Sequence, residues 1–188
     1  SCRDNYPAAW CTILNGLSLP TMPEGLIERM LDREGITGAK RELLLGRYQE
    51  RRRQLREMLA QGSVQEILCL PNPEAVQSGS VKLNLGAEML EASVSYTPGE
   101  YAEHIAAIRE LVNGEKNYHL TLLPQVPFRE LQVFTLKDAV AVLRCQEPYT
   151  AFVFKNEILT RSIFSYCDSL IEQFAADRYT TMQALSNV

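Results

Sequence analysis

Several features that would identify a chemistry are missing from this sequence of 188 residues. It contains no G-x-S-x-G, no Walker loop and no G-x-G-x-x-G, so the local signatures of serine hydrolases and of nucleotide-binding proteins are absent. It has only two histidines, and no H-E-x-x-H includes either of them. We therefore expect no catalytic residues, no metal site and no cofactor.

The cysteines also argue against familiar classes. They are five, an odd number, widely scattered and without a C-x-x-C, so neither a disulfide framework nor a structural zinc site is indicated. We expect free thiols that serve in packing. The residues are Cys2, Cys11, Cys69, Cys145 and Cys167.

Long apolar runs and excess positive charge are missing too. No run approaches the roughly 18 to 20 apolar residues that span a bilayer, and the first 30 residues do not resemble a signal peptide. We expect a cytoplasmic protein that does not enter the membrane. The net charge of −4 argues against direct DNA binding, which normally requires a basic surface.

What is present is a helical opening followed by alternating strands and helices. Residues 1–20 predict a short helix or loop, and helices are predicted over 23–35 and 39–62. Beyond residue 63, strands are predicted at 64–71, 117–124, on both sides of Lys137-Asp138, and in "TAFVF", with helices at 97–113 and after Asn156. The fold class is thus α/β, a mixed sheet flanked by helices, with a helical segment over 1–62 and an α/β domain over 63–188.

"TAFVF" is apolar on both faces, which predicts a central strand in a sheet covered on both sides. Thr97, Pro98 and Glu100 form a capping-box pattern at the start of the helix that follows. On that helix we expect His104 and Glu100 to form an ordinary surface pair. His119 is expected to be a hydrogen-bonded core or edge histidine of its strand.

The helix over 39–62 carries apolar residues at coiled-coil spacing, interrupted once by an arginine. The seam consists of Leu45, Tyr48, Arg52, Leu55 and Leu59. Two interpretations remain open: an amphipathic helix packed on its own domain, or a helix that joins two copies. We expect a homodimer in which this helix contributes to the interface.

Residues 131–164 resemble the phospholipase D fold in outline. "LQVFTLKD" ends in Asp138, at the place of the aspartate in that family's H-x-K-x-x-x-x-D motif, but Leu131 and Val133 replace the histidine and lysine. "FKNEILTRS" resembles the family's G-S-x-N segment, with Asn156 at the asparagine. The resemblance implies a related fold without the nucleophile, and hence no phosphodiesterase activity.

Residues 40–174 also look like the domain that follows a helix-turn-helix in transcriptional regulators of Firmicutes type. The similar segments are "LLGRYQERRRQLREML", "TPGEYAEHIAAIRELV" and "AFVFKNEILTRSIFSYCDSL". This resemblance implies an effector-sensing and dimerisation domain of a bacterial regulator. The DNA-binding domain would then lie upstream of Ser1, which fits the acidic charge.

A small anionic effector is the expected ligand. Asn156 opens a helix whose N-terminal N–H groups attract anions, and Lys155 and Arg144 could add positive charge. The ordinary alternative is that Asn156 only caps the helix and both cations are solvated.

Two other functions stay open. The chain could be a scaffold that joins proteins without binding a small molecule. It could also be a hydrolase or transferase whose site is assembled from residues distant in sequence, such as His119, Asp138 and Cys145.

Overall fold

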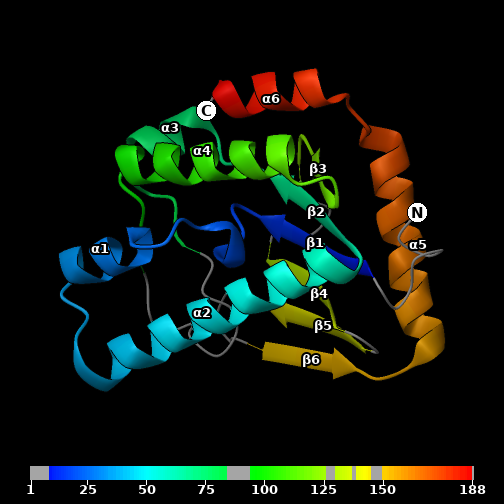
Figure 1. Cartoon of the computed structure of the whole chain (residues 1–188), viewed down its shortest axis with the longest axis horizontal. Coiled ribbons are helices and arrows are strands. Elements are labelled where there is room, and N and C mark those ends of the chain that lie inside the picture. Colours follow the sequence, from blue (N-terminus) through cyan, green and yellow to red (C-terminus); the bar gives the residue numbers. More distant parts are fainter. Residues whose placement is uncertain (1–8, 84–93, 126–129, 137–138, 145–149, 188) are drawn as a thin grey trace.

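The computed structural model describes residues 9–83, 94–125, 130–136, 139–144 and 150–187, and it shows a six-stranded sheet with helices around it (Figure 1). The strands are β1 (Ala9–Asn15), β2 (Ser63–Cys69), β3 (Tyr118–Leu122), β4 (Leu131–Leu136), β5 (Ala139–Arg144) and β6 (Thr150–Phe154). The helices are η1 (Leu19–Thr21), α1 (Leu26–Arg33), α2 (Gly38–Gln61), α3 (Pro73–Gln77), α4 (Pro98–Gly114), α5 (Glu157–Phe174) and α6 (Arg178–Ser186). The predicted α/β class with a mixed, helix-flanked sheet is confirmed.

The sheet has a parallel half and an antiparallel half, in the spatial order β3-β2-β1-β4-β5-β6. β1, β2 and β3 are parallel, so each connection between them must return to the starting edge and contains helices, α1 and α2 first, then α3 and α4. β4 pairs with the other side of β1, and β5 and β6 extend the sheet as antiparallel neighbours.

β1 corrects the prediction for the start of the chain. Ala9–Asn15 form a strand between β2 and β4, where the sequence predicts a helix or loop. Both faces of this strand are covered, which favours an apolar run without polar alternation. One sheet therefore takes strands from both sides of residue 62, where the sequence predicts a boundary.

Two hydrophobic cores lie on opposite faces of the sheet. The larger packs α1, α2, α4 and part of α6 on one face, against side chains such as Trp10 and Val64. In the smaller core all helical residues come from α5, chiefly Phe164, Cys167 and Leu170. A helix is about 10 Å wide, whereas six strands at about 4.8 Å spacing span roughly twice that. One helix therefore leaves parts of its face of the sheet uncovered.

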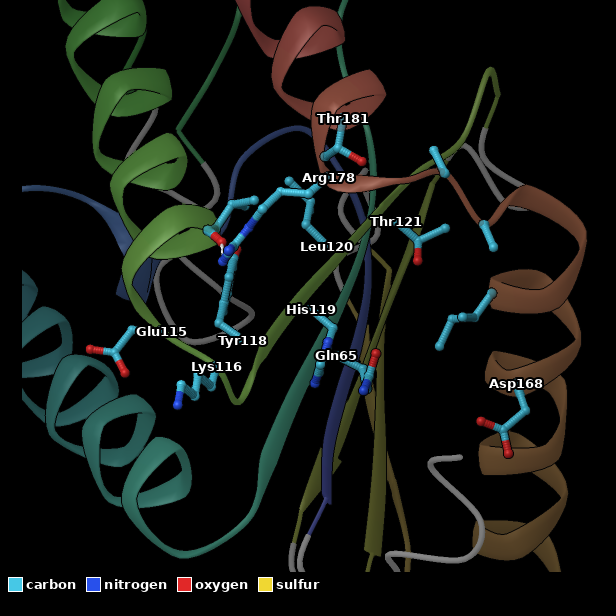
Figure 2. Close-up of a pocket in the computed structure, with 14 residues that line it drawn as sticks. Gln65, Glu115, Lys116, Tyr118, His119, Leu120, Thr121, Asp168, Arg178 and Thr181 are labelled. Atoms are coloured by element: carbon cyan, nitrogen blue, oxygen red, sulfur yellow. Dashed lines mark hydrogen bonds between the residues drawn. The ribbon is translucent and has the colours of Figure 1, made fainter.

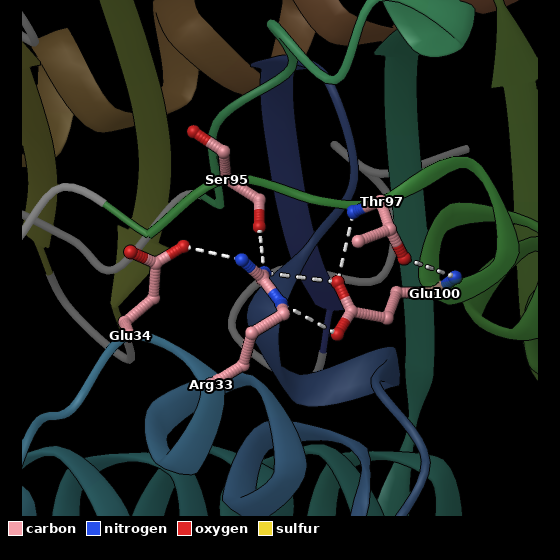
Figure 3. Close-up of polar contacts among 5 residues, drawn as sticks. All are labelled: Arg33, Glu34, Ser95, Thr97 and Glu100. Atoms are coloured by element: carbon pink, nitrogen blue, oxygen red, sulfur yellow. Dashed lines mark hydrogen bonds and ion pairs between the residues drawn. The ribbon is translucent and has the colours of Figure 1, made fainter.

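The start of α4 shows how local sequence fixes an element (Figure 3). Thr97 Oγ1 accepts from the Glu100 N–H at 3.2 Å, and the Glu100 carboxylate accepts from the Thr97 N–H at 2.8 Å, so the predicted capping box is confirmed. Arg33 of α1 donates to the same carboxylate at 3.0 Å and also to Glu34 and the Ser95 carbonyl. Burial alone would raise the pKa of Glu100, but Arg33 and the Thr97 N–H outweigh it and the pKa is lowered. The capped end of α4 is thus tied to α1.

α2 packs on the core of its own chain. Tyr48 and Leu55 are each 3% exposed within the larger core, and Leu45 and Leu59 pack at its margin. The Tyr48 hydroxyl donates to the Met22 carbonyl at 2.9 Å. The seam along α2 is therefore used inside the chain and is not available to a second copy, which corrects the predicted interface.

β6 lies at an edge of the sheet, so the prediction of a central strand for "TAFVF" is wrong. Residues 151–154 are all exposed. The other edge strand, β3, is treated differently, because α6 packs beside both β3 and α4 (Figure 1). The two edges of the sheet are unequally covered. Within the described ranges, no helix has the length and apolar character to cross a bilayer.

Candidate functional site

The uncovered part of the α5 face next to β3 is hollowed into a pocket of about 590 Å³, which we call the β3 pocket (Figure 2). It lies between the sheet, the second half of α5, the start of α6 and the end of α4. Its volume is within the range of sites that hold small molecules. The polar side chains that line it include Gln65, Lys116, His119, Thr121, Asp168 and Arg178.

Gln65 and His119 form the floor of the pocket. The register pairs Gln65 of β2 with His119 of β3, so their side chains lie next to one another on the same face of the sheet. Thr121 follows on the same face two residues later. Figure 2 shows no hydrogen bond between the Gln65 amide or the His119 ring and the other residues drawn. Both groups therefore point into the pocket and can bind a ligand.

Charges of both signs surround this floor. Lys116 follows α4 and Arg178 begins α6, while Asp168 lies on α5 at the opposite wall (Figure 2). The Arg178 guanidinium donates to the Val112 carbonyl in the last turn of α4, which holds this cation at the rim. Partial burial lowers the pKa of His119, so its ring is neutral at physiological pH.

The pocket is equipped to bind a molecule by hydrogen bonds and charge. Among the described residues that line it there is no serine or cysteine to act as a nucleophile. In the described part of the chain, no group of three His, Cys, Asp or Glu side chains is placed to hold a metal ion. Amide, imidazole and hydroxyl groups on the floor, with cations at the rim, suit a small polar ligand that carries an anionic group.

A second pocket of about 420 Å³ lies between η1, α2 and α4. Arg52 and Arg56 line it, beside Leu55 and Leu59. Arg52 already donates to the Met22 carbonyl at 3.3 Å and to the Tyr48 hydroxyl. Because the fold uses this guanidinium, the second pocket is the weaker candidate.

A buried polar cluster lies between the sheet and α4, and His104 is part of it. The His104 ring is completely buried, with Nε2 2.9 Å from Thr21 Oγ1 and Nδ1 2.9 Å from the Tyr96 hydroxyl. Burial lowers its pKa to about 3, against the opposing effect of a hydrogen bond with the Ser18 backbone. The predicted surface pair with Glu100 is therefore wrong, because α4 turns His104 towards the core.

Glu66 is the second buried titratable group, on β2. It accepts from the Tyr118 hydroxyl at 2.6 Å, while its Oε1 has no hydrogen-bond partner among the described residues. Burial raises the pKa of Glu66, and hydrogen bonds from Ser18 and Tyr118 oppose this rise. Tyr118 also contributes to the wall of the β3 pocket, so this carboxyl lies one side chain away from it.

The anion site predicted from Arg144, Lys155 and Asn156 is not assembled. Arg144 pairs with Thr150 at the start of β6, whereas Lys155 and Asn156 follow its end, roughly 17 Å further along the strand. Asn156 Oδ1 accepts from the Leu159 N–H at 3.0 Å and is the N-cap of α5. The ordinary alternative, a helix cap, is confirmed for Asn156.

Arg144 has a different environment from the one predicted. Its guanidinium lies 3.4 Å from Glu130 Oε2 in a partly exposed ion pair. An exposed pair of this kind contributes little to stability. It also partly neutralises the cation.

The segments that resemble phospholipase D are likewise apart. Leu131 lies at the Arg144 end of the sheet, and Asn156 lies beyond the other end of β6. Val133 is buried in the smaller core against α5. Asp138 lies outside the described residues, as does Cys145, so the site considered from His119, Asp138 and Cys145 stays untested.

The sequence analysis noticed His119 but missed Gln65, Lys116 and Arg178 as its neighbours. Gln65 had one usable signal, since it interrupts the apolar run "VQEILCL" on the face opposite Val64. Lys116 and Arg178 are separated by 61 intervening residues and meet only because α6 folds back beside β3 and α4. No local pattern encodes that return.

No family model, curated protein or solved structure matches this chain. Its function is therefore argued from the geometry of its own residues.

Proposed function

We propose that this chain is the effector-sensing and dimerisation domain of a cytoplasmic bacterial transcriptional regulator, in which a separate helix-turn-helix domain reads the DNA. The effector is a small polar molecule with an anionic group, bound in the β3 pocket. One observation carries the sensing role: the floor of this pocket presents Gln65 and His119, two polar side chains that the fold itself does not require.

The position of the pocket supports a sensing role. Its walls come from α4, α5, α6 and the sheet, so a ligand there would contact elements of both hydrophobic cores. A ligand that binds between such elements favours the arrangement in which they are close together. A change of this kind could be passed to an attached domain.

Charge supports a division of labour with another domain. A net charge of −4 disfavours contact with the phosphate backbone, so DNA would be read elsewhere in the regulator. Regulators that read two half-sites generally do so as two-fold dimers. The order of the β4–β5 pair, β6 and the capped α5 is also the basis on which we propose a phospholipase D-like fold without the catalytic histidine and lysine.

One observation favours a second candidate function, a scaffold that joins proteins without a small ligand. The apolar side chains of β6 and the start of α5 are exposed, as an association surface requires. The two candidates differ in whether the β3 pocket binds anything.

Thermal unfolding in the presence of small anions tests the sensing role. The probes are inorganic phosphate, citrate, short dicarboxylates and sugar phosphates, each at millimolar concentration. A probe present at a hundred times its Kd should raise the Tm by roughly 5 to 10 °C for a chain of this length.

Variants assign the effect to the β3 pocket. Lys116→Gln removes a rim cation and His119→Ala removes a floor group, and each should reduce the shift. Lys40→Gln, on an exposed position of α2 outside the pocket, is the matched control and should leave it unchanged. If no probe shifts the Tm, or if His119→Ala and Lys116→Gln respond as the wild type does, the sensing role is wrong.

A further inference from the structure

β6 leaves one side of its backbone without a strand partner. β5 pairs with it from Thr150 to Phe154, and no strand of the described residues lies beyond it. Half of its N–H and C=O groups therefore point away from the sheet. Natural edge strands are usually protected by charges, proline, a bulge or a covering element. "TAFVF" carries neither charge nor proline.

The side chains at this edge form an apolar surface, which we call the β6 patch. Its members and exposed fractions are Phe152 (53%), Val153 (56%), Phe154 (38%), Ile158 (78%) and Leu159 (36%). Only two other large apolar side chains of the described residues are exposed, Leu43 and Tyr179, so exposure is concentrated at this edge. The Phe152 and Phe154 rings are stacked, with centroids 6.3 Å apart and planes inclined by 17°.

We propose that β6 pairs with β6 of a second copy of this chain, antiparallel, about a two-fold axis at Phe152. The two six-stranded sheets then form one continuous sheet, with α5 of both copies on the same face. This inference deepens the dimerisation part of the proposed function and rests on it.

The second copy is favoured because the strand is complementary to itself. Around an axis at Phe152, Thr150 faces Phe154, Ala151 faces Val153, and Phe152 faces its own copy. Every opposed pair is uncharged, so no like charges meet. This centre also engages all five residues of the strand, and the opposed Phe152 rings add an aromatic pair.

The exposed area approaches what a stable dimer needs. Interfaces of standard size bury about 800 Å² per partner. With about 200 Å² for a whole phenylalanine side chain and somewhat less for the aliphatic ones, the exposed parts of the β6 patch supply on the order of 500 Å². The strand backbone and the flanks of α5 would add the remainder. Charges at the margin do not oppose this, since Glu157 and Arg161 form an ion pair at 3.0 Å within α5.

Cysteine cross-linking tests the axis directly. Opposed residues of an antiparallel pair have Cα atoms about 4.5 to 5.5 Å apart, which is within reach of a disulfide. Phe152→Cys should therefore give a covalent dimer on mild oxidation. Phe154→Cys is the matched control on the same strand and face, because its two copies would be about 14 Å apart and should not cross-link.

The wild type, carried through the same oxidation, measures the background from the native cysteines. Equal cross-linking of the two variants, or none above background for Phe152→Cys, would overturn the proposed pairing. Cross-linking of Phe154→Cys alone would do the same, because it requires another register.

Sedimentation supplies an independent test. Phe152→Asp places two carboxylates on the axis and should weaken dimerisation at least tenfold. Leu43→Asp is the control, since Leu43 is also about half-exposed but lies on α2. Thermal unfolding of Phe152→Asp should remain cooperative, because the side chain is exposed within one copy.

A wild type that sediments as a monomer at tens of micromolar would overturn the inference and show that the edge has another occupant or none. If that monomer still binds a probe in the β3 pocket, the sensing role survives. If the dimer forms but no probe binds, dimerisation stands and sensing fails.

Discussion

His104 is held as a neutral imidazole between two hydroxyl groups, Thr21 on one side and Tyr96 on the other. Each ring nitrogen has a partner, so the ring can be buried without an unsatisfied polar atom. A charged ring in the same place would lack the hydration that water provides, which is why burial lowers its pKa to about 3 from 6.5. The residue therefore stabilises the fold only while it is neutral.

This gives a dependence of stability on pH. As the pH falls from about 6.5 to about 3, His104 takes up a proton in the unfolded chain but not in the folded one. The free energy of unfolding should therefore fall on acidification across that window. Glu66, whose pKa is raised by burial, contributes with the opposite sign as the pH rises above its unfolded value, so the His104 effect must be isolated by comparison with a variant.

His104→Leu is the variant that isolates it. Urea unfolding at a series of pH values should show a flatter dependence between about pH 6.5 and pH 4 than in the wild type. Near pH 7 the variant should be less stable by about 2 to 4 kcal/mol, because the Thr21 and Tyr96 hydroxyls lose their partner. His119→Ala, a change at the partly buried second histidine, should alter the slope less. An unchanged slope in His104→Leu would show that another group causes the acid sensitivity.

At the residue scale, the sequence identified both histidines but not their surroundings. His104 is three residues from Tyr101, and the two share the buried side of α4, so helical spacing did carry a signal for its burial. Its partners Thr21 and Tyr96 come from two other segments, which a single sequence does not connect. His119 was correctly placed on the face opposite Tyr118, but the neighbouring Gln65 depends on the register between β2 and β3.

At the scale of elements, α2, α4 and α5 could be predicted closely because their ends are encoded locally. Thr97 and Asn156 are caps whose side chains accept from the helix N-terminus, as their sequence contexts predict. β1 was missed because "AWCTILN" has neither polar alternation nor a turn signal close to its start.

The error on β6 is more informative. A strand that is apolar on both faces is expected to be buried, but the pattern does not say by what. Within one copy, Phe152 and Val153 remain more than half exposed. A second copy paired at this edge would bury them, and the sequence pattern and the structure would then agree.

Leu55 tests whether α2 serves the core or an interface. It is 3% exposed in the larger core, so Leu55→Ala should lower the free energy of unfolding by about 2 to 5 kcal/mol through the cavity it leaves. Dimerisation should be unaffected as long as the variant is folded. Leu43→Ala, on the same helix but exposed, should change stability by no more than about 0.5 kcal/mol. Chemical denaturation and sedimentation at one protein concentration measure both quantities. A folded but monomeric Leu55→Ala would return the interface to α2.

At the scale of the whole molecule, the two edges of the sheet have different roles in this account. α6 crosses beside β3 and completes the β3 pocket, so this edge is closed by the chain itself and is proposed for the effector. β6 is left open and is proposed for the second copy. α5 spans the face between them, contacting β1, β3 and β5, and is the element through which occupancy of the pocket could reach the dimer edge (Figure 1).

Hydrogen exchange of the β6 amides at low and high protein concentration tests this arrangement most directly. If β6 pairs with a second copy, exchange in a peptide covering residues 150–154 should slow as the concentration rises through the dimer dissociation constant, because the outward N–H groups become hydrogen-bonded. A peptide from α2 covering residues 45–59 should exchange at a rate that does not depend on concentration. Protection that grows in the α2 peptide while β6 stays unchanged would contradict the account and place the interface along α2.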